Sequence, residues 1–208
     1  ALLLLTADQL VALLNYYLTR MSEIIIAEHG TVDKYEGDAI VAFVGAPVPM
    51  KDHAERACSA ALKMKKSEVA INREILEVAA LPQKPEEIPE NLYSAFKIMV
   101  KNKRTIFTRI GLNSGEIVAG FMGSDNKKNY TVMGNNVNLA SRLEGVNKQY
   151  STGGILMSEA TRKQLGDEFI VRSLDRVQVV NVKTPIRLYE LLDFKSDVDE
   201  KFLAYVKL

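Results

Sequence analysis

The segment 31–43, TVDKYEGDAIVAF, carries the side chains of this sequence that are best suited to chemistry. Asp38 directly follows Gly37 in a predicted tight turn, so its carboxylate would project from a rigid scaffold. An oxygen ligand of that kind suits Mg²⁺ or Mn²⁺. The alternative is that the aspartate only serves the turn itself. Lys34 lies four residues earlier, where a lysine taken alone indicates a solvated strand position.

A second group of polar residues lies further along the chain. Asn138 and Arg142 are spaced i, i+4, so on a helix they share one face. An amide beside a guanidinium can hold a polar or phosphorylated ligand, and a solvated helix surface is the alternative. Arg109 lies in TRIGLNSG, a predicted half-buried strand, where its charge requires a carboxylate or a phosphate as partner.

Alternating helices and strands must position these residues. Hydrophobic periodicity and a capping-box pattern at Thr6 predict helices over about residues 7–28, 52–77, 91–100, 136–148 and 158–165. Strands are predicted over residues 1–4, 31–35, 39–44, 105–113, 116–122, 130–133, 154–158, 169–182 and 186–192, with the run 39–44 buried. This order predicts an α+β sandwich with helices over one sheet.

Composition narrows the classes of function. The 208 residues are 47% hydrophobic and 25% charged, the balance of one soluble globular core. A net charge of +1 provides no strong field for recruiting nucleic acid or an acidic membrane, and we predict no nucleic-acid partner. No apolar run is expected to span a membrane. Cys58 is the single cysteine, which excludes an internal disulfide, and its helical context predicts a small core residue.

Five segments in order resemble the class III adenylyl and guanylyl cyclases. They read HGTVDKYEGDAIVAFVGAP, DHAERACSAAL, RIGLNSGEIVAGFMGS, NYTVMGNNVNLASRLEGVNK and LYELL, with near-family spacing apart from an insertion at about 81–103. The resemblance implies one catalytic domain over residues 1–193, followed by a C-terminal tail over 194–208. It also implies a ferredoxin-like βαββαβ core with C-terminal extensions.

The resemblance assigns a role to each matching residue. Asp38 corresponds to one of two metal-binding aspartates, which implies two Mg²⁺ or Mn²⁺ ions per site. Lys34 corresponds to the lysine that reads adenine, and Thr131 occupies the place of its partner. Threonine at that place resembles the soluble, bicarbonate-responsive type of adenylyl cyclase. Lys34 favours ATP, because guanine presents an N1–H group that needs an acceptor.

The remaining roles concern the sugar and the phosphates. Asn138 corresponds to the asparagine that orients the ribose, and Arg142 to the arginine that stabilises charge on the α-phosphate. Arg109 corresponds to an arginine at the terminal phosphates. The family often has a lysine there in a V-K-G-K stretch; an ungapped comparison puts Val180 at its place, and Lys183 is the nearby substitute.

The function that the resemblance implies is conversion of ATP to 3′,5′-cyclic AMP and pyrophosphate in intracellular signalling. Lys34 and Asp38 share one hairpin but must address opposite ends of the nucleotide, so we expect sites shared across a head-to-tail homodimer. We also expect a cytoplasmic domain attached to an N-terminal sensory or membrane domain. The alternatives are a degenerate cyclase domain that binds nucleotide or only dimerises, and a guanylyl cyclase. A generic ferredoxin-like RNA-binding domain would need aromatic residues for stacking on its sheet, which this sequence does not provide.

One motif of the family is missing. The other metal-binding aspartate belongs to an F-x-D-I-x-x-F-T segment between the first strand and the first helix, but here Leu4 runs directly into Leu5-Thr6. We expect that this loop is left out at a break near Leu4–Leu5, and that it is not deleted from the protein.

Overall fold

The structure is a computed structural model that describes residues 4–178 and 185–206. Its first half consists of helix α1 (Ala7–Ala27), strands β1 (Thr31–Glu36) and β2 (Ala39–Phe43), and helices α2 (His53–Ala80) and α3 (Glu90–Lys101). Its second half consists of β3 (Ile110–Leu112), β4 (Val118–Ser124), β5 (Lys127–Met133), α4 (Asn135–Val146), β6 (Ile155–Ser158), α5 (Glu159–Arg162), β7 (Phe169–Val177), β8 (Ile186–Phe194) and α6 (Glu200–Val206). Two 3-10 turns, Asn147–Gln149 and Lys195–Asp197, follow α4 and β8. The predicted order of helices and strands is confirmed from α1 to β8 over the described residues, whereas α6 was not predicted.

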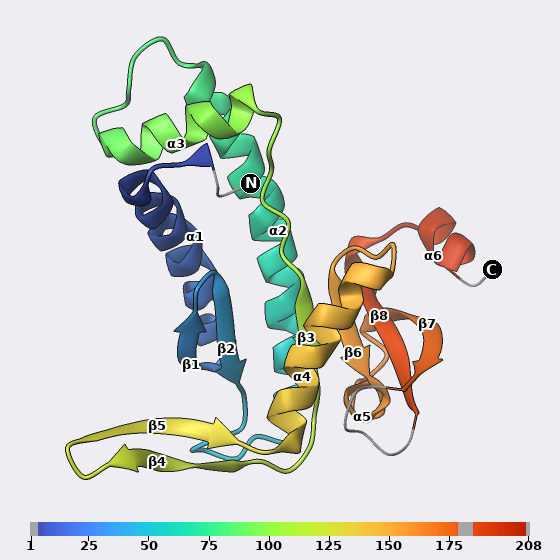
Figure 1. Cartoon of the computed structure of the whole chain (residues 1–208). Helices are drawn as coiled ribbons and strands as arrows, with labels where there is room; N and C mark the ends of the chain where they lie inside the picture. Colours follow the sequence, from blue (N-terminus) through green and yellow to red (C-terminus); the bar gives the residue numbers. More distant parts are fainter. Residues whose placement is uncertain (1–3, 179–184, 207–208) are drawn as a thin grey trace.

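The strands form three sheets, so the prediction of one sheet is wrong for the described residues. A four-stranded sheet has the order β3-β6-β8-β7, while β1 pairs only with β2 and β4 only with β5. Figure 1 shows the β1–β2 hairpin beside α1 and the larger sheet on the other side of α2. Leu4, the one described residue of the predicted first strand, lies in a 3-10 turn. Consequently no described strand joins β2 to β3.

Two predicted strand properties are also wrong. The expected strand at 105–113 shrinks to Ile110–Leu112, because the backbone around Thr108 and Ile106 bonds to the α2 side chains of Glu68 and Asn72 in place of a neighbouring strand. The run 39–44 is mostly half-exposed, and within it only Phe43 is buried. An apolar run predicts burial only when a second layer covers it, and β2 belongs to a two-stranded sheet.

The ends of α1 show how the local sequence sets a helix. Thr6 accepts a bond from the Gln9 backbone, while the Gln9 side chain accepts from the Thr6 backbone, which is the predicted capping box. At the other end, His29 takes the left-handed conformation (φ 60°), and the amides of His29 and Gly30 bond back to Ile26 and Ile25. The predicted glycine cap is therefore a Schellman motif whose left-handed residue is a histidine.

The predicted insertion folds into a helix that completes the first core. Side chains of α3 interlock with those of α1 and α2 in one buried cluster: Leu13, Met21, Ile25, Met64, Ile71, Ile75, Leu92, Ala95, Phe96 and Met99.

Helix α1 is long and apolar enough to cross a membrane, judged by length and composition alone. The expectation that no segment could span a membrane is therefore corrected. Leu13, Met21 and Ile25 of this helix are buried in the cluster, whereas Val11 and Ile26 are exposed.

A second core lies under the larger sheet and includes the single cysteine. Cys58 is fully buried with Ala61 and Leu62 of α2 against Ile155 and Met157 of β6, as the sequence predicted. Burial raises the pKa of the Cys58 thiol to about 12, so the group stays protonated and unreactive at neutral pH.

Helix α4 lies directly on β3 because Gly111 has no side chain. A Cβ atom at Gly111 would come within 2.1 Å of the Ala140 carbonyl oxygen and 2.6 Å of the Glu144 nitrogen. The inner face of α4 also buries Leu139 and Leu143. The outer face of this helix is therefore held in a fixed place relative to the sheet.

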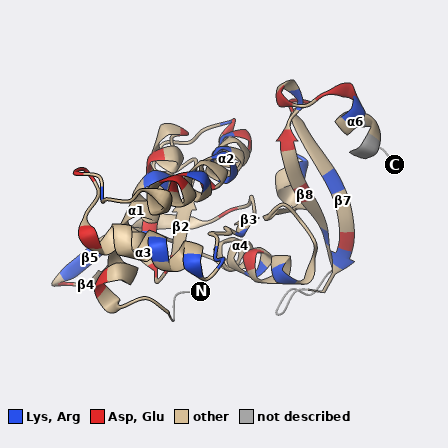
Figure 2. Cartoon of the chain, turned by 90° about the horizontal axis from the view of Figure 1, so that it is seen from above, with Lys and Arg blue, Asp and Glu red and all other residues tan. Residues whose placement is uncertain are grey.

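Acidic and basic residues are interspersed along the helices and strands of the described chain. Figure 2 shows blue and red segments alternating over the ribbons, including the β7–β8 hairpin. This distribution agrees with the net charge of +1.

Candidate active site

The β1–β2 hairpin presents the predicted metal ligand at its turn. Gly37 has φ of +66° with open space around it, so the turn requires glycine for its backbone conformation. Asp38 follows it, is exposed, and has no hydrogen bond or ion pair within the described residues. Burial raises the pKa of Tyr17 in α1, and the charges of Glu68 and then Asp38 raise it further. The oxygens of the Asp38 carboxylate are unused as ligands among the described residues.

Lys34 lies lower on the same hairpin and has a neighbour that sequence reasoning passed over. The pairing of β1 with β2 shifts between Val32 and Lys34, which leaves Asp33 as an extra residue in a β-bulge. The Lys34 Nζ atom is 3.3 Å from Asp33 Oδ2. The ammonium group is thus held next to a carboxylate on its own strand.

Thr131 lies on β5, opposite Gly120 of β4. Its hydroxyl oxygen is buried and has no hydrogen-bond partner in the described structure. Strand β5 contacts β1, and the Tyr130 ring lies 6.3 Å from the Phe43 ring of β2. The structure therefore brings the strand of Thr131 against the hairpin of Lys34, as a shared base-binding role requires.

Helix α4 presents Asn138 and Arg142 on its more open side. Asn138 is exposed and Arg142 is half-buried, and neither side chain has a hydrogen bond or ion pair among the described residues. Asn136, two residues before Asn138, is fully committed, because it donates to the Glu116 carbonyl and accepts from Asn113. The two predicted ligand-binding side chains of α4 are free to meet a ligand.

Arg109 has the partner that its half-buried position requires. Its Nε atom donates to Glu144 Oε1 of α4 at 3.0 Å, and the Arg109 side chain is 34% exposed. The sequence left open whether this partner would be a carboxylate or a phosphate, and here it is a carboxylate. Only the Nε–H group is used, so the terminal nitrogens of the guanidinium remain available.

The described residues do not assemble a complete metal site. No group of three or more His, Cys, Asp or Glu side chains gathers anywhere in residues 4–178 and 185–206. Asp38 nevertheless suits one ligand position, because Mg²⁺ is commonly held by one or two carboxylates together with substrate phosphates and water. Lys183, the predicted contact to the terminal phosphates, lies outside the described residues.

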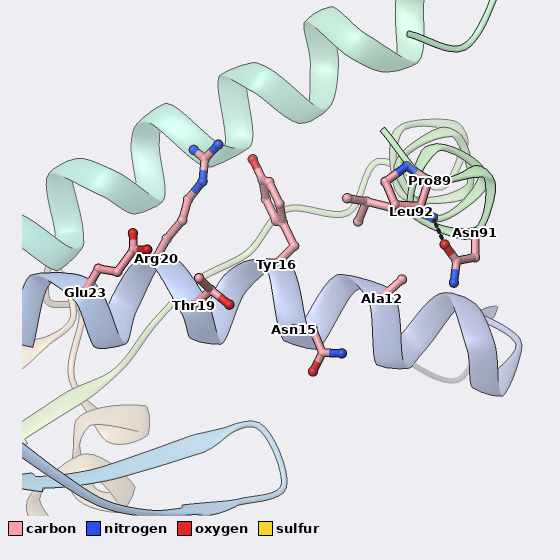
Figure 3. A pocket seen from close by; sticks show the side chains of 9 residues that line it. All are labelled: Ala12, Asn15, Tyr16, Thr19, Arg20, Glu23, Pro89, Asn91 and Leu92. Atoms are coloured by element: carbon pink, nitrogen blue, oxygen red, sulfur yellow. Dashed lines mark hydrogen bonds between the residues drawn. The ribbon is translucent and has the colours of Figure 1, made fainter. Parts of the chain in front are cut away.

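One hollow of the described surface lies away from these residues. It has a volume of about 640 Å³ and lies between α1 and α3. Figure 3 shows Tyr16 and Arg20 pointing from α1 toward α2, with Asn91 of α3 at the other end. Arg20 is already paired with Glu74 at 2.8 Å and stacks on the Tyr16 ring. None of the predicted site residues lines this hollow.

The sequence matches, over residues 3–193, the family described as the adenylate and guanylate cyclase catalytic domain. The chain belongs to this family. It is 34% identical over 185 residues to adenylate cyclase 1 of Rhizobium meliloti (strain 1021), a match that covers 89% of this chain and 24% of that protein. The cyclase domain described here therefore spans about a quarter of that relative.

Solved structures agree with this membership. The cyclase domain resembles the adenylyl cyclase CyaB from P. aeruginosa, with a TM-score of 0.71 and 30% identity, covering 94% of this chain and 88% of that one. It also resembles the guanylyl cyclase Cya2, with a TM-score of 0.74 and 26% identity over 94% and 86% of the two chains. The predicted α+β cyclase fold is thereby confirmed. Since both kinds of cyclase are similar, the choice of purine depends on the site residues.

Two residues around the site were missed from the sequence. Glu144 is the partner of Arg109, and 35 positions separate them, so no local pattern links the two. Asp33 is adjacent to Lys34, but neighbours on a regular strand point to opposite faces, and only the bulge brings them together. The only hint of this contact in the sequence was that an acidic and a basic residue are adjacent at positions 33 and 34.

Proposed function

We propose that this cyclase domain converts ATP to 3′,5′-cyclic AMP and pyrophosphate. The observation that carries the proposal is the contact between the strand of Lys34 and the strand of Thr131. One strand presents an ammonium group, and the strand in contact with it presents a buried hydroxyl with no partner in the described structure. A buried polar group without a partner costs free energy, and a ligand that supplies the bond recovers it.

The choice of ATP over GTP follows from donors and acceptors. Adenine presents N1 as an acceptor and its amino group as a donor, which suits the Lys34 ammonium and the Thr131 oxygen. Guanine presents the opposite order, an N1–H donor beside the O6 acceptor. A lysine can only donate, so guanine would leave its N1–H group unpaired against Lys34.

The proposed chemistry is an in-line displacement at the α-phosphorus. The ribose 3′-oxygen forms the new P–O bond as it loses its proton, and pyrophosphate leaves with the electron pair of the broken bond. Asn138 orients the ribose, and the neighbouring Arg142 neutralises charge that builds up on the α-phosphate oxygens. Arg109 offers its free guanidinium nitrogens to the terminal phosphates while Glu144 holds its Nε–H group. Lys183 is proposed for the same phosphates on sequence grounds alone.

Asp38 is the proposed protein ligand for divalent metal. Two Mg²⁺ or Mn²⁺ ions, held by Asp38, the substrate phosphates and the aspartate of the missing family motif, would lower the pKa of the 3′-hydroxyl and neutralise the leaving group. The exposed position of Asp38 and its unused oxygens are compatible with this role.

We further propose that the active unit is a homodimer with two shared sites. Lys34 of β1 and Asp38 of the following turn share one hairpin but would address opposite ends of the nucleotide, so one nucleotide would meet them on different subunits. The β4–β5 hairpin extends from α4 beneath the β1–β2 hairpin (Figure 1) and exposes three large apolar side chains, Val118, Phe121 and Met133. We propose that a second copy of the chain packs against these apolar side chains of the β4–β5 hairpin.

The wider setting of the domain is proposed from its chemistry. ATP and reduced thiols such as Cys58 both point to the cytoplasm. An N-terminal sensory or membrane domain remains the proposed source of regulation.

The purine assignment is tested by measuring cyclic AMP and cyclic GMP formation by the full-length protein with Mn²⁺. We expect activity with ATP and little with GTP. The double variant Lys34→Glu/Thr131→Cys, which carries the residue types of guanylyl cyclases at both places, should lose ATP activity and gain GTP activity. Equal or greater wild-type activity with GTP would overturn the proposal.

A further inference from the structure

The bulge in β1 places a carboxylate where a regular strand would not. Successive side chains of a strand point to opposite faces, so Asp33 and Lys34 should be directed apart. The register shift between Val32 and Lys34 re-aims them, and the Lys34 ammonium comes to 3.3 Å from Asp33 Oδ2. The β1–β2 hairpin needs no extra residue for its turn, which lies at Gly37. The bulge therefore changes how the Asp33 and Lys34 side chains are directed and does not serve the turn.

The two members of the pair differ sharply in exposure. The Asp33 side chain is 2% exposed, while that of Lys34 is 46% exposed. The Oδ2 atom of Asp33 is buried and makes no hydrogen bond in the described structure, so the contact with Lys34 is an ion pair that lacks hydrogen-bond geometry. A buried carboxylate needs a cation, and Lys34 is its one ion-pair partner among the described residues. The aspartate is therefore the buried member of the pair and the lysine the exposed one.

We infer that Asp33 is a positioning residue that fixes the Lys34 ammonium against the purine and thereby sets the preference for ATP over GTP. The inference rests on the proposed function, in which Lys34 donates to adenine N1. A free lysine has a long flexible stem and loses its rotamer freedom when it binds. Asp33 restricts the ammonium before the nucleotide arrives, so less freedom is lost on binding. The purine base, oriented by Lys34, then meets Thr131 on β5, the strand that contacts β1.

The experiment measures kcat and KM for ATP and GTP in the full-length protein and in Asp33→Asn, which keeps the size of the side chain and removes its charge. We expect kcat/KM for ATP to fall about tenfold, mainly through KM, because binding of the base is weakened equally in the ground and transition states. The ratio of ATP to GTP activity should fall by a similar factor. Asp167→Asn, an exposed aspartate between α5 and β7, is the matched control and should leave all values unchanged.

A double-mutant cycle separates positioning from a merely structural role. In a Lys34→Met background, Asp33→Asn should change the ATP to GTP ratio no further, since its effect passes through the lysine. The unfolding midpoint gives a readout independent of activity. Lys34→Met should lower it by leaving the buried Asp33 unpaired, and adding Asp33→Asn should raise it again by about 2–4 °C.

The outcomes are distinguishable. If the wild-type protein makes cyclic AMP but Asp33→Asn keeps the wild-type KM and ATP to GTP ratio, the inference is wrong and the proposed function stands. An equal loss of selectivity in the Lys34→Met background, or no recovery of the unfolding midpoint, also overturns the inference. A wild-type protein that prefers GTP, or that cyclises neither nucleotide, overturns the proposed function and the inference together.

Discussion

At the scale of single residues, the site is marked by side chains that the fold leaves unused. Asn138 and Arg142 make no bonds within the described chain, whereas the neighbouring Asn136 is fully engaged. Their spacing was readable from the sequence because a helix places i and i+4 on one face. Their freedom was not readable, because it depends on which distant groups reach α4.

Replacing Arg142 by alanine should therefore harm catalysis and spare stability. We expect kcat to fall roughly 10²–10³-fold, the usual cost of removing one preorganised donor to developing charge, with KM little changed. Arg142→Lys should recover only part of the activity, because lysine keeps the charge but loses the planar fork. Steady-state kinetics with ATP and a thermal unfolding scan provide the measurements.

Arg73→Ala is a suitable control for that variant. Arg73 lies on α2 with its side chain 75% exposed and pairs only weakly with Glu77 at 3.9 Å. Its removal should leave both kcat and the unfolding midpoint at wild-type values. A comparable loss in both variants, or a clear destabilisation by Arg142→Ala, would count against a transition-state role.

At the scale of elements, one glycine decides where the ligand-binding helix lies. Gly111 in β3 permits the backbone of α4 to approach so closely that no other residue fits, and α4 carries Asn138 and Arg142. Strand and helix were both predicted from the sequence, but their close approach was not. The segment RIGLNSG gives no local reason to distinguish this glycine from a turn glycine.

We expect Gly111→Ala to destabilise the domain by about 3 kcal/mol or more, since the new Cβ would meet backbone atoms that cannot rotate away. Gly145→Ala is the matched control within α4. A Cβ there meets nothing within 4 Å, so the substitution should be neutral or stabilise the helix by up to about 1 kcal/mol. Urea unfolding followed by circular dichroism measures both free energies. Similar effects of the two substitutions would show that α4 does not depend on contact with β3.

At the scale of the whole molecule, the described strands form three separate sheets, and the site residues are spread over all of the corresponding layers. Lys34 and Asp38 belong to β1–β2, Thr131 to β4–β5, and Arg142 to the helix on the larger sheet. The proposed roles of Lys34 and Asp38 lie at opposite ends of one nucleotide, although both residues belong to one hairpin. The proposed homodimer would accommodate both roles, with each residue serving a different site.

Mixing two inactive variants tests the shared sites. Asp38→Ala and Arg142→Ala should each be nearly inactive, but their heterodimer contains one site with both residues intact. Random exchange makes about half of the dimers heterodimers, each with one of two sites, so about a quarter of the wild-type activity should return. Absence of recovery in a sample with confirmed heterodimers would place Asp38 and Arg142 in the same subunit's site.

The sequence by itself determined the family, the order of helices and strands, and the residue types of the site. These properties are local, because capping, periodicity and motif spacing depend on residues close together in the chain. The tertiary structure alone decided that Glu144 engages Arg109, that Asp33 meets Lys34 in a bulge, and that Thr131 is left without a partner in the described chain. Those facts depend on which surfaces meet when layers pack, and no spacing along the chain encodes that.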